Sequence, residues 1–142
     1  MRTLHHGNTE RDGILGSATV AQRLTLDLAS SPRAPRQARQ AITELLTRSG
    51  RTDRAADAAL LVSELVTNAV MHAGGPISVS ATYLDATLHV EVHDTDQHPL
   101  PDLRKPSASD KTGRGLHLVK LLADRWAITP TPDGKTIWFE LT

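Results

Sequence analysis

The stretch DRAADAALLVSELVTNAVMHA, residues 53–73, decides the fold of this chain. Its aliphatic residues recur with the i, i+3, i+4, i+7, i+8, i+11 spacing that places them on one stripe of an α-helix. The members of this stripe are Val62, Leu65, Val66, Ala69, Val70 and Ala73. The run Gly74-Gly75-Pro76 follows them and is typical of a helix end. We therefore expect a long helix that packs one face on a hydrophobic core.

Segments of alternating apolar and polar residues flank this helix and predict β-strands, because successive side chains of a strand point to opposite faces. The predicted strands are residues 24–28, 77–83, 88–92, 126–129 and 136–141. Tight turns at Asp85 and at Pro132-Asp133-Gly134 predict two antiparallel hairpins. Two further helices are expected, one from Ser31-Pro32 to Ser49-Gly50 and one over Leu116–Ala123.

Helices that separate antiparallel hairpins predict an α+β fold. We expect a two-layer α/β sandwich, with a mostly antiparallel sheet covered on one face by helices. The length of 142 residues fits one domain of this kind. Residues 20–142 are assigned to it, and residues 1–19, which lack apolar periodicity, to a flexible N-terminal arm. His5-His6 in this arm is interpreted as part of a solvated tail, with a metal site as the alternative.

The composition argues against several classes of function. Sixteen Lys and Arg balance sixteen Asp and Glu, so no electrostatic signal for direct nucleic-acid or membrane binding is expected. The absence of cysteine excludes disulfides, thiolate metal sites and cysteine nucleophiles. No apolar run reaches the roughly 18 residues of a membrane span, and no signal-peptide core is present. The expected location is the cytoplasm.

Three polar residues share a flank of the long helix. Glu64, Asn68 and His72 are spaced i, i+4, i+8, which places them together and off the apolar stripe. A carboxylate one turn from an amide carbonyl can orient a hydroxyl or water and hold a hydrated Mg²⁺. The alternative for such a pair is a solvated helix face. His72 alone is typical of a cation that the helix dipole favours near the C-terminus.

A carboxylate stands at the end of a strand that faces the core. The period of two puts Asp94 on the same face as Leu88, Val90 and Val92. Burying it without hydrogen-bond partners is costly, so we expect it to accept hydrogen bonds. The donors could come from loop backbone, from water or from the exocyclic amine of adenine.

A glycine-rich segment, Thr112-Gly113-Arg114-Gly115, precedes the third helix. Glycine permits a close backbone approach, and the free N–H groups of a helix start attract anions. Arg114 could add charge to a phosphate site. An ordinary loop-to-helix turn is the alternative, because the segment matches neither the P-loop nor the dinucleotide fingerprint.

In this order the motifs resemble those of the GHKL ATPase superfamily. Glu64-Leu-Val-Thr-Asn68-Ala-Val-Met-His72-Ala is similar to its N box, Val92-His-Asp94 to the start of its G1 box, and Thr112-Gly-Arg-Gly-Leu-His-Leu-Val119 to its G2 box. Ala123-Asp-Arg-Trp126 and Gly134-Lys-Thr-Ile-Trp-Phe139 resemble the closing strands of a small actinobacterial branch. That branch is similar to anti-sigma-factor serine kinases of the RsbW/SpoIIAB type. The resemblance covers about residues 22–142.

The resemblance implies ATP and Mg²⁺ as cofactors and gives each motif a role. Glu64 would be the general base, Asn68 the Mg²⁺ ligand, Asp94 the adenine reader and Gly113–Gly115 phosphate contacts, with residues 95–112 as the ATP lid. It also assigns these residues to nucleotide binding: His72, Thr112, Arg114, Leu116 and Thr136.

One departure from the family pattern lies after Asp94. Asp96 and His98 stand where the G1 box usually has glycines that let the backbone turn beside the nucleotide. The extra carboxylate of Asp96 would repel phosphates unless a cation offsets it. Lys105, Lys111 and Arg114 are the candidates for that cation.

The function that the resemblance implies is an anti-sigma factor that is also an ATP-dependent protein serine/threonine kinase. Its partners would be a sigma factor, an anti-anti-sigma antagonist protein, or both, and the resemblance also allows a homodimer. A non-catalytic module of the same fold, which sequesters a regulator with weak or no nucleotide binding, is the alternative. A detached histidine-kinase catalytic module is a third hypothesis, and it would need a phosphoacceptor partner.

Overall fold

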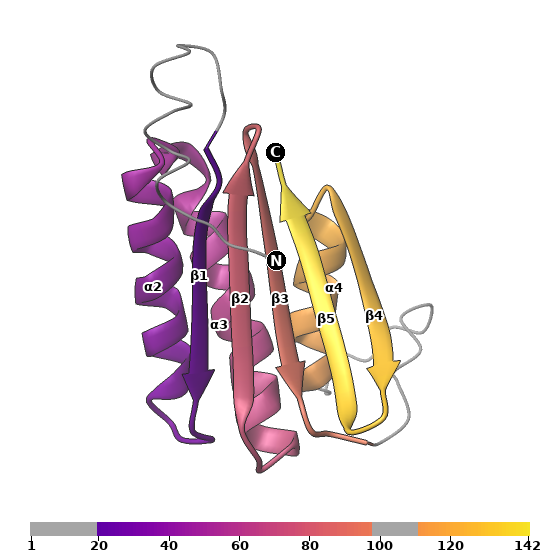
Figure 1. The fold of residues 1–142 in the computed structure, drawn as a ribbon. Helices are drawn as coiled ribbons and strands as arrows, with labels where there is room; N and C mark the ends of the chain where they lie inside the picture. The colour runs from indigo at the N-terminus through magenta and orange to yellow at the C-terminus, as the bar shows by residue number, and fades with distance from the viewer. Residues whose placement is uncertain (1–19, 98–110) are drawn as a thin grey trace.

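The protein folds into one antiparallel sheet with helices on one of its faces, as a computed structural model shows (Figure 1). The structure describes residues 20–97 and 111–142, with only the backbone for 111–115. The elements are β1 (Gln22–Leu28), α2 (Ala34–Arg48), the short 3₁₀ turn η1 (Thr52–Arg54), α3 (Ala55–His72), β2 (Ile77–Leu84), β3 (Thr87–Asp94), α4 (Lys111–Leu122), β4 (Arg125–Thr131) and β5 (Gly134–Leu141). The strand order is β1-β2-β3-β5-β4, and every neighbouring pair is antiparallel. The predicted two-layer α+β fold is confirmed. The assignment of 1–19 to an arm lies outside the described residues.

The core lies between the sheet and the three helices. Alternate residues of the inner strands are buried, as the period of two predicts. The largest fully buried side chains are Phe139, Ile42, Leu45, Leu46, Leu61, Leu65, Ile77, Leu88, Leu116, Leu141, Val62 and Val66. Aliphatic side chains therefore supply nearly all of this core, with Phe139 as its aromatic member.

The other face of the sheet carries the polar half of each strand. On it, His89 lies between two carboxylates, with its ring nitrogens 2.9 Å from Glu140 and 2.8 Å from Glu91. The His89 ring also stacks on Trp138 at a centroid distance of 5.2 Å. This polar row explains why helices cover only the opposite face.

The predicted hairpin between β2 and β3 is confirmed and turns through Asp85 and Ala86. Both residues have positive φ, 53° and 62°, which matches the two-residue turn that the right-handed twist of strands favours. The register that this turn fixes pairs Ser78 with His93.

Two helix starts differ from the prediction. α2 begins at Ala34 because Ser31 and Pro32 form a turn ahead of it, in which the Ser31 carbonyl accepts the Ala34 N–H at 3.1 Å. α4 begins at Lys111, so Gly113–Gly115 lie in its first turns and not before them. Glycine costs about 1 kcal/mol in a helix interior, which favoured a later start in the sequence analysis.

Several helices and strands begin or end at one end of the sheet, the lower end in Figure 1. β3 ends there at Asp94 and β5 begins there, since Asp94 pairs with Lys135. α3 ends at the same place, because the loop after it leads into β2, whose Ser78 lies beside His93. α4 leads into Arg125, which pairs with Glu140 at the opposite end, so α4 begins near Asp94. The chain thus gathers the predicted site elements at this end.

Candidate functional site

The polar flank of α3 runs towards the end of the sheet that carries Asp94. Glu64 is half-buried, Asn68 is buried with 6% of its surface exposed, and His72 is exposed. The prediction that all three lie off the buried stripe is wrong for Asn68, because α3 packs against both the sheet and α4. A buried amide one turn from a carboxylate offers oxygen ligands of the kind that Mg²⁺ takes.

Asp94 is buried as predicted, with 2% of its surface exposed. Its carboxylate accepts hydrogen bonds from Lys135 Nζ, at 3.0 Å to Oδ1 and 2.8 Å to Oδ2. The backbone N–H of Asp96 donates to Oδ1 at 2.9 Å. Loop backbone, one of the three predicted donors, is therefore confirmed, and a lysine of the chain itself is a donor that the sequence analysis did not name.

Lys135 is the residue that sequence reasoning missed. It is 8% exposed, and its Nζ also lies 3.3 Å from Oδ2 of Asp96. One ammonium thus contacts both carboxylates. The signal was present in the sequence, since Lys135 shares the period of two with the buried Ile137 and Phe139. Of the predicted cations for Asp96, Lys105 and the side chains of Lys111 and Arg114 lie outside the described part.

Glycines keep the backbone around Asp94 tightly packed. A Cβ added to Gly134 would overlap the carbonyl oxygen of Asp94 and lie 2.7 Å from Cα of Thr95. A Cβ added to Gly75, in the loop after α3, would lie 2.6 Å from the Thr95 hydroxyl. The end of β3 is therefore held between the start of β5 and the loop that follows α3.

Thr136 does not join this group, which corrects its predicted role in nucleotide binding. Asp94 and Lys135 face the helices, so the next residue of β5 faces the opposite side of the sheet. There the Thr136 hydroxyl lies 3.0 Å from Nδ1 of His93. Any ligand held by Asp94 is on the other face.

The structure describes the glycine-rich segment through its backbone. Residues 112–115 belong to the first turns of α4, and their side chains are not described. Leu116 is 1% exposed and packs in the core, so its side chain supports α4, and its role in nucleotide binding stays a prediction. His98 and most of the predicted lid, residues 98–110, lie outside the described residues.

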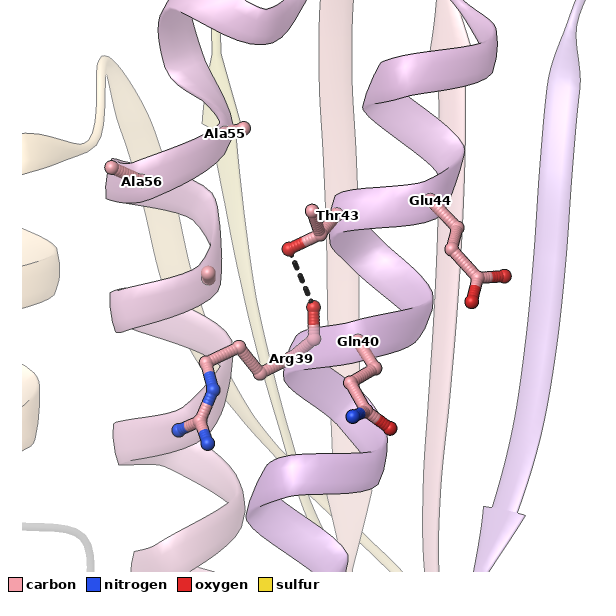
Figure 2. A pocket seen from close by; sticks show the side chains of 7 residues that line it. Arg39, Gln40, Thr43, Glu44, Ala55 and Ala56 are labelled. Atoms are coloured by element: carbon pink, nitrogen blue, oxygen red, sulfur yellow. Dashed lines mark hydrogen bonds between the residues drawn. The ribbon is translucent and has the colours of Figure 1, made fainter.

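A groove of about 560 Å³ lies between α2 and α3 (Figure 2). Arg39, Gln40, Thr43 and Glu44 line it from α2, and Ala55, Ala56 and Ala59 line it from α3. The Thr43 hydroxyl donates to the Arg39 carbonyl of its own helix at 2.8 Å. None of the residues predicted for the nucleotide site lines this groove.

Two negative findings concern only residues 20–97 and 111–142. No three His, Asp or Glu side chains gather there as metal ligands. None of the helices in that part of the chain has the length and apolar character needed to cross a membrane.

Residues 28–141 match the family described as the histidine kinase-like ATPase domain. This match spans most of the chain. The chain therefore belongs to the histidine kinase-like ATPase domain family. No curated protein matches it closely enough to count as a relative.

A solved structure shares the fold. It is the crystal structure of the RsbU and RsbW domains of Rv1364c from Mycobacterium tuberculosis, with a TM-score of 0.66 and 24% sequence identity. The match covers 83% of this chain and 31% of that one. The chain thus spans about a third of the length of the protein it resembles, and at this identity the similarity shows the fold alone.

Proposed function

We propose that this chain is an ATP-binding regulatory protein, an anti-sigma factor that is also a serine/threonine kinase for an antagonist protein. The observation that carries the proposal is that α3, with Glu64 and Asn68, ends beside the strand end that carries the buried Asp94. Membership of the histidine kinase-like ATPase family supports the nucleotide. The fold shared with a chain that contains an RsbW domain supports the regulatory role. A sigma factor as partner would place the protein in the cytoplasm.

The residues of α3 fit the metal end of a Mg²⁺-nucleotide. When bound, Mg-ATP supplies the phosphoryl group together with a cation that neutralises its charge. The buried amide oxygen of Asn68 would hold the metal, which keeps water and phosphate as its other ligands. The Glu64 carboxylate would accept the proton of the serine or threonine hydroxyl of the antagonist. Backbone N–H groups in the first turn of α4 would face the phosphates.

An adenine amine that binds Asp94 would have to share the carboxylate with the ammonium of Lys135. The carboxylate has four acceptor positions, and the three hydrogen bonds to described residues occupy both on Oδ1 and one on Oδ2. One position on Oδ2 is left for an amine. The base can therefore be read by Asp94, with the ammonium of Lys135 as its neighbour.

The ion pair of Lys135 and Asp94 favours a second candidate function. A carboxylate that is satisfied within the chain needs no ligand to be buried. The same fold could then sequester a sigma factor or another regulator with weak or no nucleotide binding. Calorimetric titration with Mg-ATP separates the two functions. Binding that Asp94→Ala abolishes supports the first, and no heat at millimolar nucleotide supports the second.

Kinase activity is tested by incubating the chain with radiolabelled ATP, Mg²⁺ and a candidate antagonist protein. Glu64→Gln should abolish phosphate transfer and leave nucleotide binding unchanged, because the amide cannot accept the proton. Glu44→Gln, on the exposed side of α2, is the matched control and should transfer as the wild type does. Transfer that survives Glu64→Gln would overturn the assignment of the base.

A further inference from the structure

We propose that Lys135 is a specificity-determining residue that competes with a purine amine for Asp94 and so weakens the discrimination between amino- and oxo-purines. This inference rests on the proposed nucleotide site. It concerns only the edge of the base and makes no use of the phosphate or metal groups. Its basis is that the carboxylate that would read the base already holds the ammonium of Lys135.

The geometry makes Lys135 compete with a purine amine for the acceptor positions of the Asp94 carboxylate. Its Nζ lies within 3.0 Å of both oxygens of Asp94, so it spans the carboxylate as a bidentate partner would. The Asp96 N–H occupies a further acceptor position on Oδ1. A purine amine can therefore add a hydrogen bond only at Oδ2, the oxygen with the shorter bond to Lys135. A strong bond from the amine requires Nζ to give up part of that contact.

The Lys135 side chain can move when a ligand approaches, whereas the backbone of Asp94 is held in place. The backbone of Asp94 is packed against Gly134, where no Cβ can be placed, and it pairs with Lys135 in the β3–β5 ladder. The lysine head sits on a flexible four-carbon stem. It also has a second acceptor, Oδ2 of Asp96 at 3.3 Å. When an amine approaches Oδ2 of Asp94, Nζ can shift towards Asp96 and remain paired.

The charges of Asp94 and Lys135 explain why the preference for amino-purines over oxo-purines is weakened. An unpaired Asp94 would attract an amine at position 6 of a purine and repel a carbonyl oxygen at the same position. The adjacent ammonium cancels most of that repulsion, since an oxo group can accept from it. Wild-type protein should therefore bind adenosine and inosine, which differ in the group at position 6 and in the proton that inosine carries on N1, with affinities within about tenfold of each other.

The test compares adenosine with inosine by calorimetry, because neither nucleoside carries phosphate and charge repulsion at the triphosphate is absent. Lys135→Met should raise the preference for adenosine over inosine by about 10- to 100-fold, the range of a hydrogen bond to a charged group. Lys135→Arg keeps a cation on Asp94 and should retain the low preference. Lys120→Met, an exposed lysine of α4, is the matched control and should behave as wild type.

A measurement on the wild type covers the case in which Lys135→Met does not fold. The ammonium resonance of Lys135 in ¹⁵N NMR should shift on saturation with adenosine and shift less with inosine. An unchanged resonance at saturating adenosine would overturn the proposal. So would a wild-type preference for adenosine that already exceeds tenfold and is unaffected by Lys135→Met. Absence of adenosine binding to wild type and variant alike would instead overturn the nucleotide site itself.

Discussion

The ammonium of Lys135 lies 2.8 Å from Oδ2 and 3.0 Å from Oδ1 of Asp94, and the two residues occupy paired positions of β5 and β3. Both are almost entirely buried, so neither charge is hydrated if its partner is removed. A buried ion pair adds little stability over an apolar pair of the same volume, whereas removal of one partner leaves an uncompensated charge. The pair therefore adds little to the free energy of unfolding, although the loss of either partner alone is costly.

Removing the charge of Lys135 alone should cost more stability than removing both charges. Lys135→Met leaves Asp94 buried without its cation, for which a loss of about 3–5 kcal/mol in the free energy of unfolding is typical. The double variant Asp94→Asn with Lys135→Met should recover about half of that loss or more. Urea unfolding of wild type, both single variants and the double variant measures the coupling. Additive losses would show that the two side chains do not interact in solution.

The two glycines next to Thr95 should differ in their tolerance of a side chain. Gly134→Ala places a methyl group against backbone atoms of Asp94 and Thr95 and should cost about 3 kcal/mol or more. Gly75→Ala meets the Thr95 side chain, and its one close contact is with the hydroxyl, which can rotate, so the change should cost about 1 kcal/mol or less. Thermal unfolding of both variants gives the comparison. Equal losses would contradict the packing described for the end of β3.

Asn68→Ala should weaken nucleotide binding only when Mg²⁺ is present. The amide is the proposed metal ligand, so its removal should reduce the affinity for Mg-ATP by about tenfold or more and leave the affinity for ATP with a chelator unchanged. Calorimetry with and without Mg²⁺ measures the difference. Ser63→Ala, which removes a hydroxyl bonded to the Leu60 carbonyl on the same helix, is the control. An equal loss under both conditions would mean that Asn68 serves only the packing of α3.

Acid should remove a contribution of Asp124 to stability. The backbone N–H of Thr142, and then its hydroxyl, hold the pKa of Asp124 below its usual value of 3.8, and Arg54 adds to the effect. A carboxyl whose pKa is lowered in the folded state stabilises the fold fully at pH values above its unfolded-state pKa. That stabilisation is lost as the pH falls through its folded-state pKa. Asp124→Asn should therefore be less stable than wild type at neutral pH and equally stable well below pH 3.8. Urea unfolding across this range tests it, and a difference that persists in acid would contradict the pairing.

The fold was predictable because its elements follow their periods closely. The helical stripe through Val62 and Leu65 and the alternation through Val90 and Val92 fixed α3 and β3 to within a few residues. The start of α4 was missed because glycine lowers helix propensity without preventing a helix near its end. The turn at Ser31-Pro32 was read as part of α2, because proline suits both a turn and a first helical turn.

The sequence predicts on which face of the sheet each site residue lies, but it does not predict which of these residues contact one another. The period of two placed Asp94 on the core side, and the same rule applied to β5 places Lys135 there. Their contact depends on β5 lying beside β3, and no local pattern states which strands are neighbours. The role of Thr136 was implied by the resemblance alone, and the period of two places its side chain on the face opposite Lys135.

The order β1-β2-β3-β5-β4 sets a sequence of events during synthesis. Lys135 stands 41 positions after Asp94, so a growing polypeptide that has emerged from the ribosome only as far as β3 carries an acidic strand end without its cation. That end must stay hydrated, and the central hairpin remains open along one edge until residues 134–141 arrive. The β3 edge of the described sheet is therefore paired only once β5 has been synthesised.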